Sequence, residues 1–140
     1  MRHYATETTI DAPPEAVWAV LANAARYPDW DSGVERVEGE LALGATIKVF
    51  SQVSPGRAFP VRVAELEPNR RMMWRGGMPL GLFTGVRTFS LTPAREGRTA
   101  FAMREEFTGP LLPLIWRSMP DLQPSFDQFA AGLKAQAESR

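Results

Sequence analysis

The last third of the chain constrains the fold most, because it carries a large apolar stripe at helical spacing. Apolar residues recur there at steps of four, three, four and four, namely Leu122, Phe126, Phe129, Leu133 and Ala137. This spacing places them along one side of an α-helix. The opposite side carries Asp127, Gln128, Lys134 and Glu138. Such a helix needs an apolar surface to cover its stripe, and the rest of the chain must supply that surface.

Two prolines divide this stretch. Pro120 and Pro124 lie inside the apolar pattern, and a proline within a helix removes a hydrogen bond and clashes with the preceding turn. We therefore expect a break near residues 119–122 and a long regular helix over about residues 124–137.

The chain before this stretch is rich in β-formers. Residues 2–10 alternate as a strand, and Asp11 with Pro13 and Pro14 predicts the start of a short helix that is followed by a second short helix over 24–30. Six further strands are expected over 33–40, 46–53, 59–66, 71–75, 86–92 and 98–108. This order predicts a single α+β domain over residues 1–140, with helices on one side of an antiparallel sheet.

Composition excludes several classes of function. With 16 basic and 16 acidic residues the formal net charge is zero, which argues against a nucleic-acid-binding protein. There is no cysteine and one histidine, His3, so we expect no metal site, no cofactor and no Ser-His-Asp triad. No apolar run reaches the roughly 18–20 residues of an integral membrane segment. The first residues lack the apolar region of a signal peptide, so a cytoplasmic protein is expected.

Several runs together resemble the START-like superfamily, also called SRPBCC, which includes polyketide cyclase/dehydrase and lipid-transport proteins. They are Thr-Ile-Asp-Ala-Pro-Pro-Glu-Ala-Val-Trp-Ala-Val-Leu-Ala-Asn at 9–23, Arg-Tyr-Pro-Asp-Trp-Asp at 26–31, Pro-Gly-Arg at 55–57, Leu-Glu-Pro-Asn-Arg at 66–70, Glu-Glu-Phe-Thr-Gly at 105–109 and Ala-Gly-Leu-Lys-Ala-Gln-Ala-Glu at 131–138. The resemblance implies a helix-grip fold, in which a seven-stranded antiparallel sheet curves around a long C-terminal helix. It also implies two short helices after the first strand and a hydrophobic cavity. It implies no catalytic residue, because the superfamily shares no catalytic motif.

Strand alternation predicts which side chains face the helix. Folding the chain about the turn at 67–70 places Val63 opposite Trp74. Folding it about the turn at 93–97 places three pairs opposite one another, namely Leu91 and Phe101, Phe89 and Met103, and Arg87 and Glu105. Residues near the helix break are added as cavity candidates, because a broken helix packs less closely. The residues predicted to bind a ligand are Trp30, Val49, Val61, Val63, Trp74, Arg87, Phe89, Phe101, Met103, Glu105, Trp116, Met119, Leu122 and Phe126.

Arg87 and Glu105 are the two charges on this otherwise apolar face, and a buried charge is costly unless it is paired. One interpretation is that Arg87 anchors a carboxylate, carbonyl or enolate of a ligand, with Glu105 orienting it or acting as a base. The other is a structural pair or a solvated strand end. These two residues are the weak catalytic candidates.

Three smaller features leave alternatives open. Asp29 and Asp31 suggest a metal or acid–base pair, but capped turns explain them and few other oxygen ligands lie nearby. The glycine-rich residues 76–85 are expected to form a loop with sheltered apolar residues, either a gate or a plain hairpin. Trp116 could line the cavity or be exposed at a contact with a second copy or a membrane.

Three functions therefore remain. The favoured one is binding of a small hydrophobic ligand of lipid, polyketide or aromatic type between sheet and helix. This hypothesis fails if side chains fill the space between the sheet and the broken helix. The second is a polyketide cyclase or dehydratase that uses Arg87 and Glu105. The third is a protein-interaction module that docks a partner through the sheet or the Leu-Gly-Leu-Phe run at 80–83.

Overall fold

A computed structural model describes residues 1–139 and shows one seven-stranded sheet whose neighbouring strands are all antiparallel. The spatial order of the strands is β1-β7-β6-β5-β4-β3-β2. Their bounds are β1 Arg2–Ile10, β2 Val34–Glu38, β3 Thr46–Ser51, β4 Ala58–Glu67, β5 Arg71–Gly77, β6 Thr84–Pro93 and β7 Thr99–Thr108. The α+β helix-grip architecture expected from the sequence is confirmed.

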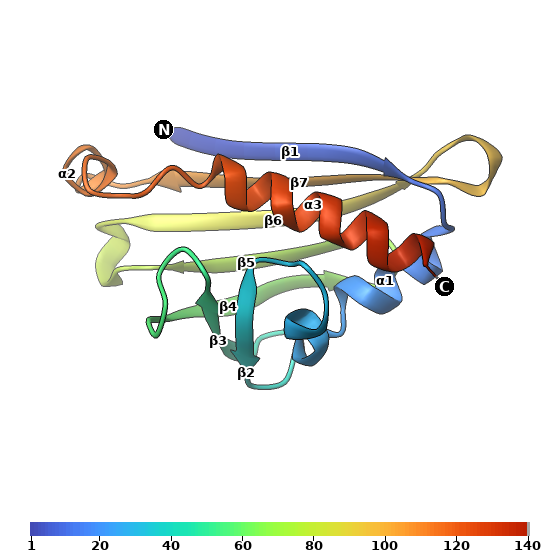
Figure 1. The fold of residues 1–140 in the computed structure, drawn as a ribbon. Coiled ribbons are helices and arrows are strands. Elements are labelled where there is room, and N and C mark those ends of the chain that lie inside the picture. Colours follow the sequence, from blue (N-terminus) through green and yellow to red (C-terminus); the bar gives the residue numbers. More distant parts are fainter. Residues whose placement is uncertain (140) are drawn as a thin grey trace.

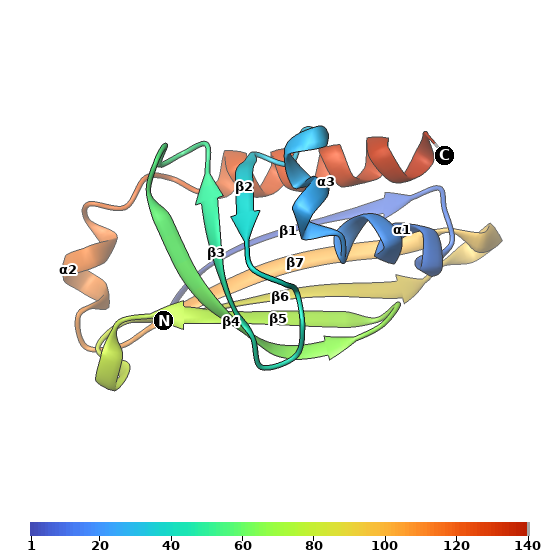
Figure 2. The same cartoon turned by 90° about the horizontal axis from the view of Figure 1, so that it is seen from below.

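The helices lie on one side of this sheet. The longest, α3 (Gln123–Glu138), crosses it and contacts β1 and β7, as Figure 1 shows in red. Helix α1 (Pro14–Leu21) and the 3-10 helix η1 (Ala24–Asp29) connect β1 to β2, and α1 packs against α3. Helix α2 (Leu112–Trp116) stands apart at the opposite end of the molecule, which is clearest in Figure 2. Short 3-10 turns η2 (Pro79–Gly81) and η3 (Arg95–Gly97) join the strands that flank them.

The predicted helix break is confirmed and is a complete interruption. Residues 117–122 are not helical, and α3 begins at Gln123, whose backbone N–H donates to the Asp121 carboxylate at 3.0 Å. That carboxylate therefore satisfies one of the free N–H groups at the helix start. The apolar stripe is buried as expected, because Phe126, Phe129 and Leu133 all face the sheet.

Side chains of α3 also bind the backbone of the edge strand β1. Gln123 Nε2 donates to the carbonyl of Ala5 at 2.8 Å, and Lys134 Nζ donates to the carbonyl of Thr9 at 2.9 Å. An edge strand has unpaired backbone groups that invite another chain to pair with it. The helix thus covers part of the β1 edge in addition to burying its apolar stripe.

The glycine-rich segment 76–85 differs from the expectation of one long loop. Gly76 pairs with Gly85 and Gly77 with Thr84, so β5 and β6 extend into it and the connection shrinks to residues 78–83. The glycine backbone continues the ladder because its neighbours on both strands are already paired. The expected shelter of the apolar residues is wrong for Leu80, whose relative exposure is 95%.

No helix in residues 1–139 has the length and apolarity needed to cross a membrane.

Candidate functional site

One row of side chains crosses the inner face of the sheet and carries the candidate site. Trp74 on β5, Arg87 on β6, Glu105 on β7 and Tyr4 on β1 are direct cross-strand partners. Val63 continues the row on β4, opposite Trp74. The predicted pairs of Val63 with Trp74 and of Arg87 with Glu105 are therefore confirmed, because the turns that set these registers lie where the sequence indicates.

Arg87 and Glu105 form a direct ion pair in this row. The Nε–H of Arg87 donates to Glu105 Oε1 at 2.6 Å, and the two side chains are 25% and 16% exposed. The guanidinium carbon of Arg87 also lies 4.8 Å from the centroid of the Phe126 ring on α3. The pair is electrically balanced and partly accessible, and the remaining guanidinium N–H groups are donors beside an apolar surface.

Two glycines lie in the next row and make room for this pair. A β-carbon on Gly85 would stand 2.7 Å from Glu105 Oε2, and one on Gly76 would stand 2.9 Å from Cγ1 of Val61. Both distances are shorter than carbon atoms tolerate, so no larger residue fits either position without displacement. Because these positions carry no side chains, Val61 packs against Gly76, and the Glu105 carboxylate and the Phe107 ring pack against Gly85.

Sequence reasoning missed these glycines and Tyr4. Extending the β5–β6 ladder by one further inward pair beyond Trp74 and Arg87 would have placed Gly76 opposite Gly85. The alternation in residues 2–10 already put Tyr4 on one face with Thr6 and Thr8, but the sequence did not show which face is inner.

The other end of the inner face is filled by a cluster of aromatic rings. Phe129 of α3 lies 5.2 Å from the Trp30 ring, 5.6 Å from Tyr27 and 5.9 Å from Phe89, measured between ring centroids. Trp74 lies 4.8 Å from Phe89. These packed rings fill this end of the inner face, because η1 and α3 both insert aromatic side chains there.

The predicted ligand-binding residues therefore divide into two groups. Those buried in or beside the packed cluster are Val49, Val63, Trp74, Phe89, Phe101, Met103 and Phe126, with Trp30 partly buried at its margin. Those that stay partly exposed toward the opposite end are Val61, Arg87, Glu105, Trp116, Met119 and Leu122.

Trp116 belongs to an aromatic group at the open end of the sheet. Its ring stacks on Tyr4 at 5.4 Å and meets Phe107 edge-on at 5.8 Å, while the guanidinium of Arg2 lies 5.3 Å from its centroid. These contacts hold α2 against β1 and β7. The non-helical residues 117–122 then connect α2 to α3.

Two indole N–H groups at the boundary between these regions have no acceptor within residues 1–139, those of Trp30 and Trp74. Between them lies Tyr27, whose hydroxyl donates to the Leu21 carbonyl at 2.5 Å. Burial raises the pKa of Tyr27 far above its ordinary value, and the positive charge of Arg87 opposes that rise. Tyr27 is therefore a neutral donor that is already engaged, whereas the indole of Trp74 remains a free donor next to Arg87.

The acidic residues near Trp30 have structural partners. Asp29 forms an ion pair with Arg26, and Asp31 accepts from Gln128 Nε2 at 2.7 Å. In residues 1–139 no group of three His, Asp or Glu side chains is arranged to hold a metal ion.

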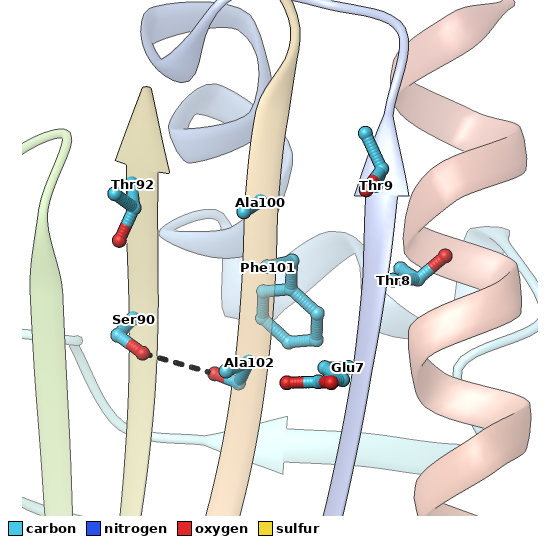
Figure 3. Close-up of a pocket in the computed structure, with 8 residues that line it drawn as sticks. All are labelled: Glu7, Thr8, Thr9, Ser90, Thr92, Ala100, Phe101 and Ala102. Carbon is cyan, nitrogen blue, oxygen red and sulfur yellow. Dashed lines mark hydrogen bonds between the residues drawn. The ribbon is translucent and has the colours of Figure 1, made fainter. Parts of the chain in front are cut away.

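Two shallow hollows lie on the outer face of the sheet, away from α3. Figure 3 shows the larger one, over β1, β6 and β7, where Ser90 Oγ donates to the Ala102 carbonyl at 3.5 Å. The small side chains of Ala100 and Ala102 form its floor, while Glu7, Thr9 and Thr92 are among the residues around it. Its neighbour is lined by Ala5, Thr6, Glu7, Ala102, Met103 and Arg104. Neither hollow lies between the sheet and α3, where the sequence predicts the ligand.

Comparison with known proteins identifies relatives across the whole chain. Residues 1–138 match the family described as polyketide cyclase/dehydrase and lipid transport. Among solved structures, the Zhui aromatase/cyclase from Streptomyces sp. R1128 is 22% identical with a TM-score of 0.78, covering 99% of this chain and 94% of that one. Protein MLL2253 from Mesorhizobium loti is 21% identical with a TM-score of 0.72, covering 99% and 98%.

A START superfamily protein from Mycobacterium smegmatis is 14% identical with a TM-score of 0.69, covering 98% of this chain and 97% of that one. At these sequence identities, the comparison shows that this chain and the three solved structures share a fold. No curated protein matches the sequence.

Proposed function

This chain belongs to the polyketide cyclase/dehydrase and lipid-transport family, and on that premise we propose that it binds a small hydrophobic ligand at the Arg87–Glu105 end of the sheet. The observation that carries the proposal is the partly exposed ion pair on an apolar face, 2.6 Å between Arg87 Nε and Glu105 Oε1. The exposed part of the two side chains, 25% and 16%, leaves the pair in reach of a polar group of a ligand.

The surroundings of the pair support a ligand with an apolar body and one oxygen-bearing head. Apolar side chains border the pair, because Val61 and Phe107 pack against the Gly76–Gly85 row and Phe126 lies against Arg87. Arg87 has N–H donors beyond the one that binds Glu105. Trp74 is its cross-strand neighbour, and the buried indole N–H of Trp74 has no acceptor within residues 1–139. The head would accept hydrogen bonds from Arg87 and Trp74, since ligand sites pair an apolar lining with a few convergent polar groups.

The first test compares a charged with an uncharged apolar probe, cis-parinaric acid and its methyl ester, by fluorescence titration. Arg87→Met should weaken binding of the acid by about 10- to 100-fold, the loss expected for a hydrogen bond to a charged group. Binding of the ester should change far less. The matched control is Arg104→Met, which removes the arginine of the outer-face Arg104–Glu106 pair at 2.9 Å and should change neither.

A double variant distinguishes loss of the ligand contact from misfolding of the single variant. Arg87→Met alone leaves Glu105 without its partner, whereas Arg87→Met with Glu105→Leu restores an apolar face. The double variant should bind the ester like the wild type and the acid weakly. Equal binding of the acid by wild type and both variants would refute Arg87 as the anchor. Native mass spectrometry of the protein purified from its host would then show whether any apolar compound co-purifies.

The second candidate is cyclase or dehydratase chemistry on a polyketide-like substrate. It is favoured by Glu105, whose Oε1 accepts from Arg87 while its Oε2 lies over Gly85 and not under a side chain. Glu105 would take the proton from a carbon next to a carbonyl, and Arg87 would stabilise the resulting enolate oxygen. The enolate carbon would attack a second carbonyl, and the alkoxide formed there would take the proton back from Glu105. Loss of the new hydroxyl with a neighbouring proton as water would then form a double bond of the ring.

The test of this candidate is the formation of aromatic absorbance from a poly-β-ketone. Glu105→Gln should abolish turnover and retain binding of the parinarate ester, because the amide keeps its shape and cannot accept the proton. If the wild type forms no more product than buffer does, the enzymatic candidate is wrong, and the binding proposal is unaffected.

A further inference from the structure

Two apolar turns project at the end of the molecule that carries α2. One is the β5–β6 connection, residues 78–83, and the other is α2 itself. Leu80 is 95% exposed, Leu114 is 66% exposed and Met78 is 42% exposed. In both Figure 1 and Figure 2 the β5–β6 connection and α2 lie at the same end of the sheet.

Backbone contacts hold these two turns together. The N–H of Leu111 donates to the carbonyl of Leu82 at 3.0 Å, and Phe83 stacks on Phe107 at 5.8 Å. A β-carbon on Gly109 would stand 2.4 Å from the Leu82 carbonyl oxygen, which shows how closely the chains approach. The two turns are therefore in contact through Leu82, Gly109 and Leu111, and we define the apolar tip as residues 78–83 and 110–116.

Leu80 is an unexpected residue at its position. Its φ of 60° is in the left-handed region, where a leucine is strained and glycine or asparagine is usual. Within residues 1–139 the other two non-glycine residues with positive φ are Asn69 and Glu96, which are polar turn residues. Leu80 gains no burial to offset this strain, so folding alone does not account for a leucine there.

The charge around the apolar tip is positive. Residues 76–86 and 107–120 contain no Asp or Glu. Arg117 follows α2 directly, and Arg2 lies against Trp116 of the same helix. Of the nearest acidic residues, Glu106 is paired with Arg104 at 2.9 Å, and Asp121 accepts from the backbone of Gln123. A partner of this tip should therefore be apolar inside and anionic at its surface.

We propose that the apolar tip docks onto an anionic lipid bilayer, with Leu80 and Leu114 inserted below the headgroups and Arg2 and Arg117 bound to their phosphates. Exposed aliphatic side chains on turns that also carry arginines suit a membrane interface. A protein partner would more often meet a broad surface with exposed aromatic anchors. The inference is independent of the ligand proposal, because docking needs no ligand.

Vesicle sedimentation tests it with the wild-type chain and two lipid compositions. The wild type should partition into vesicles of phosphatidylglycerol and phosphatidylcholine at least about tenfold more than into phosphatidylcholine alone. Leu80→Asn with Leu114→Gln should reduce that partition about tenfold or more, because two leucines no longer insert. Arg2→Gln with Arg117→Gln should remove the preference for the anionic lipid, as should high salt.

Leu43→Gln is the matched control, since Leu43 is also 66% exposed but lies in the β2–β3 connection; it should partition like the wild type. Asparagine tolerates the backbone of Leu80, so the tip variant should fold, with an unchanged circular dichroism spectrum. Binding that is equal for the tip variant and the wild type overturns the proposal. So does an absence of vesicle binding, including the case in which light scattering shows a dimer that the tip variant abolishes.

Discussion

At the scale of single residues, Tyr27 connects the packed cluster to the short helices. Its hydroxyl binds the carbonyl of Leu21 at the C-terminal end of α1, a group with no helical partner of its own. Its ring packs edge-on against Trp30 and Phe129. A tyrosine is needed here because the position demands both a large apolar ring and one donor.

Replacing Tyr27 by phenylalanine should lower the free energy of unfolding by about 1–3 kcal/mol, since the ring stays and the buried carbonyl of Leu21 loses its donor. Urea unfolding followed by circular dichroism measures the change. Tyr4→Phe is the control, because Tyr4 is half-buried and its hydroxyl donates to no acceptor within residues 1–139. A loss no larger for Tyr27 than for Tyr4 would show that the hydroxyl contributes little.

At the scale of elements, α3 is fixed by both of its ends as well as by its apolar stripe. Near its start Asp127 accepts from Thr6 Oγ1 at 2.9 Å, and near its end Glu138 accepts from the backbone N–H of Asp11 at 2.8 Å. Close packing adds to this, because a β-carbon on Gly132 would stand 2.0 Å from the Asp31 carbonyl oxygen. The helix therefore connects β1, the β1–α1 junction and the segment after η1.

The Glu138 carboxylate at the end of α3 should make the free energy of unfolding depend on pH. The hydrogen bond from Lys134, followed by that from Asp11, lowers the pKa of Glu138. A lowered pKa stabilises the fold above the ordinary glutamate value of about 4.3, and this contribution is lost as pH falls through the folded-state pKa. Wild type should exceed Glu138→Gln in urea midpoint at pH 7, and the difference should shrink between about pH 5 and pH 3.

The control for this pH series is Glu7→Gln. Glu7 is exposed on the outer face and makes no hydrogen bond or ion pair within residues 1–139. Its midpoint should follow the wild-type curve. If the gap between wild type and Glu138→Gln stays constant across the pH range, the ionised carboxylate is not the source of the stability.

At the scale of the whole molecule, the two ends of the sheet differ in how densely their side chains are packed. The end beneath α1 and η1 is packed with aromatic rings around Phe129. The end near α2 combines the accessible Arg87–Glu105 pair with the apolar tip. Dense packing at one end supplies the stability that allows the other to keep charges, glycines and exposed leucines.

The sequence by itself determined the order of the elements along the chain, the registers of two hairpins and the helix break. Turn residues and period-two alternation are local signals, so the pairing of Arg87 with Glu105 and that of Val63 with Trp74 could be predicted and are confirmed. Pro120 likewise marked the break before α3. These features depend on residues close together in the chain, or on a single hairpin.

Only the tertiary structure decided which part of the inner face is filled. Phe129, Tyr27 and Trp30 come from separate elements, and whether their rings occupy the space beside Phe89 depends on how those elements are placed in three dimensions. The same holds for the approach of α2 to the β5–β6 connection, where the N–H of Leu111 binds the carbonyl of Leu82. The burial of a side chain depends on contacts with segments that are distant in sequence, so a local sequence pattern does not determine it.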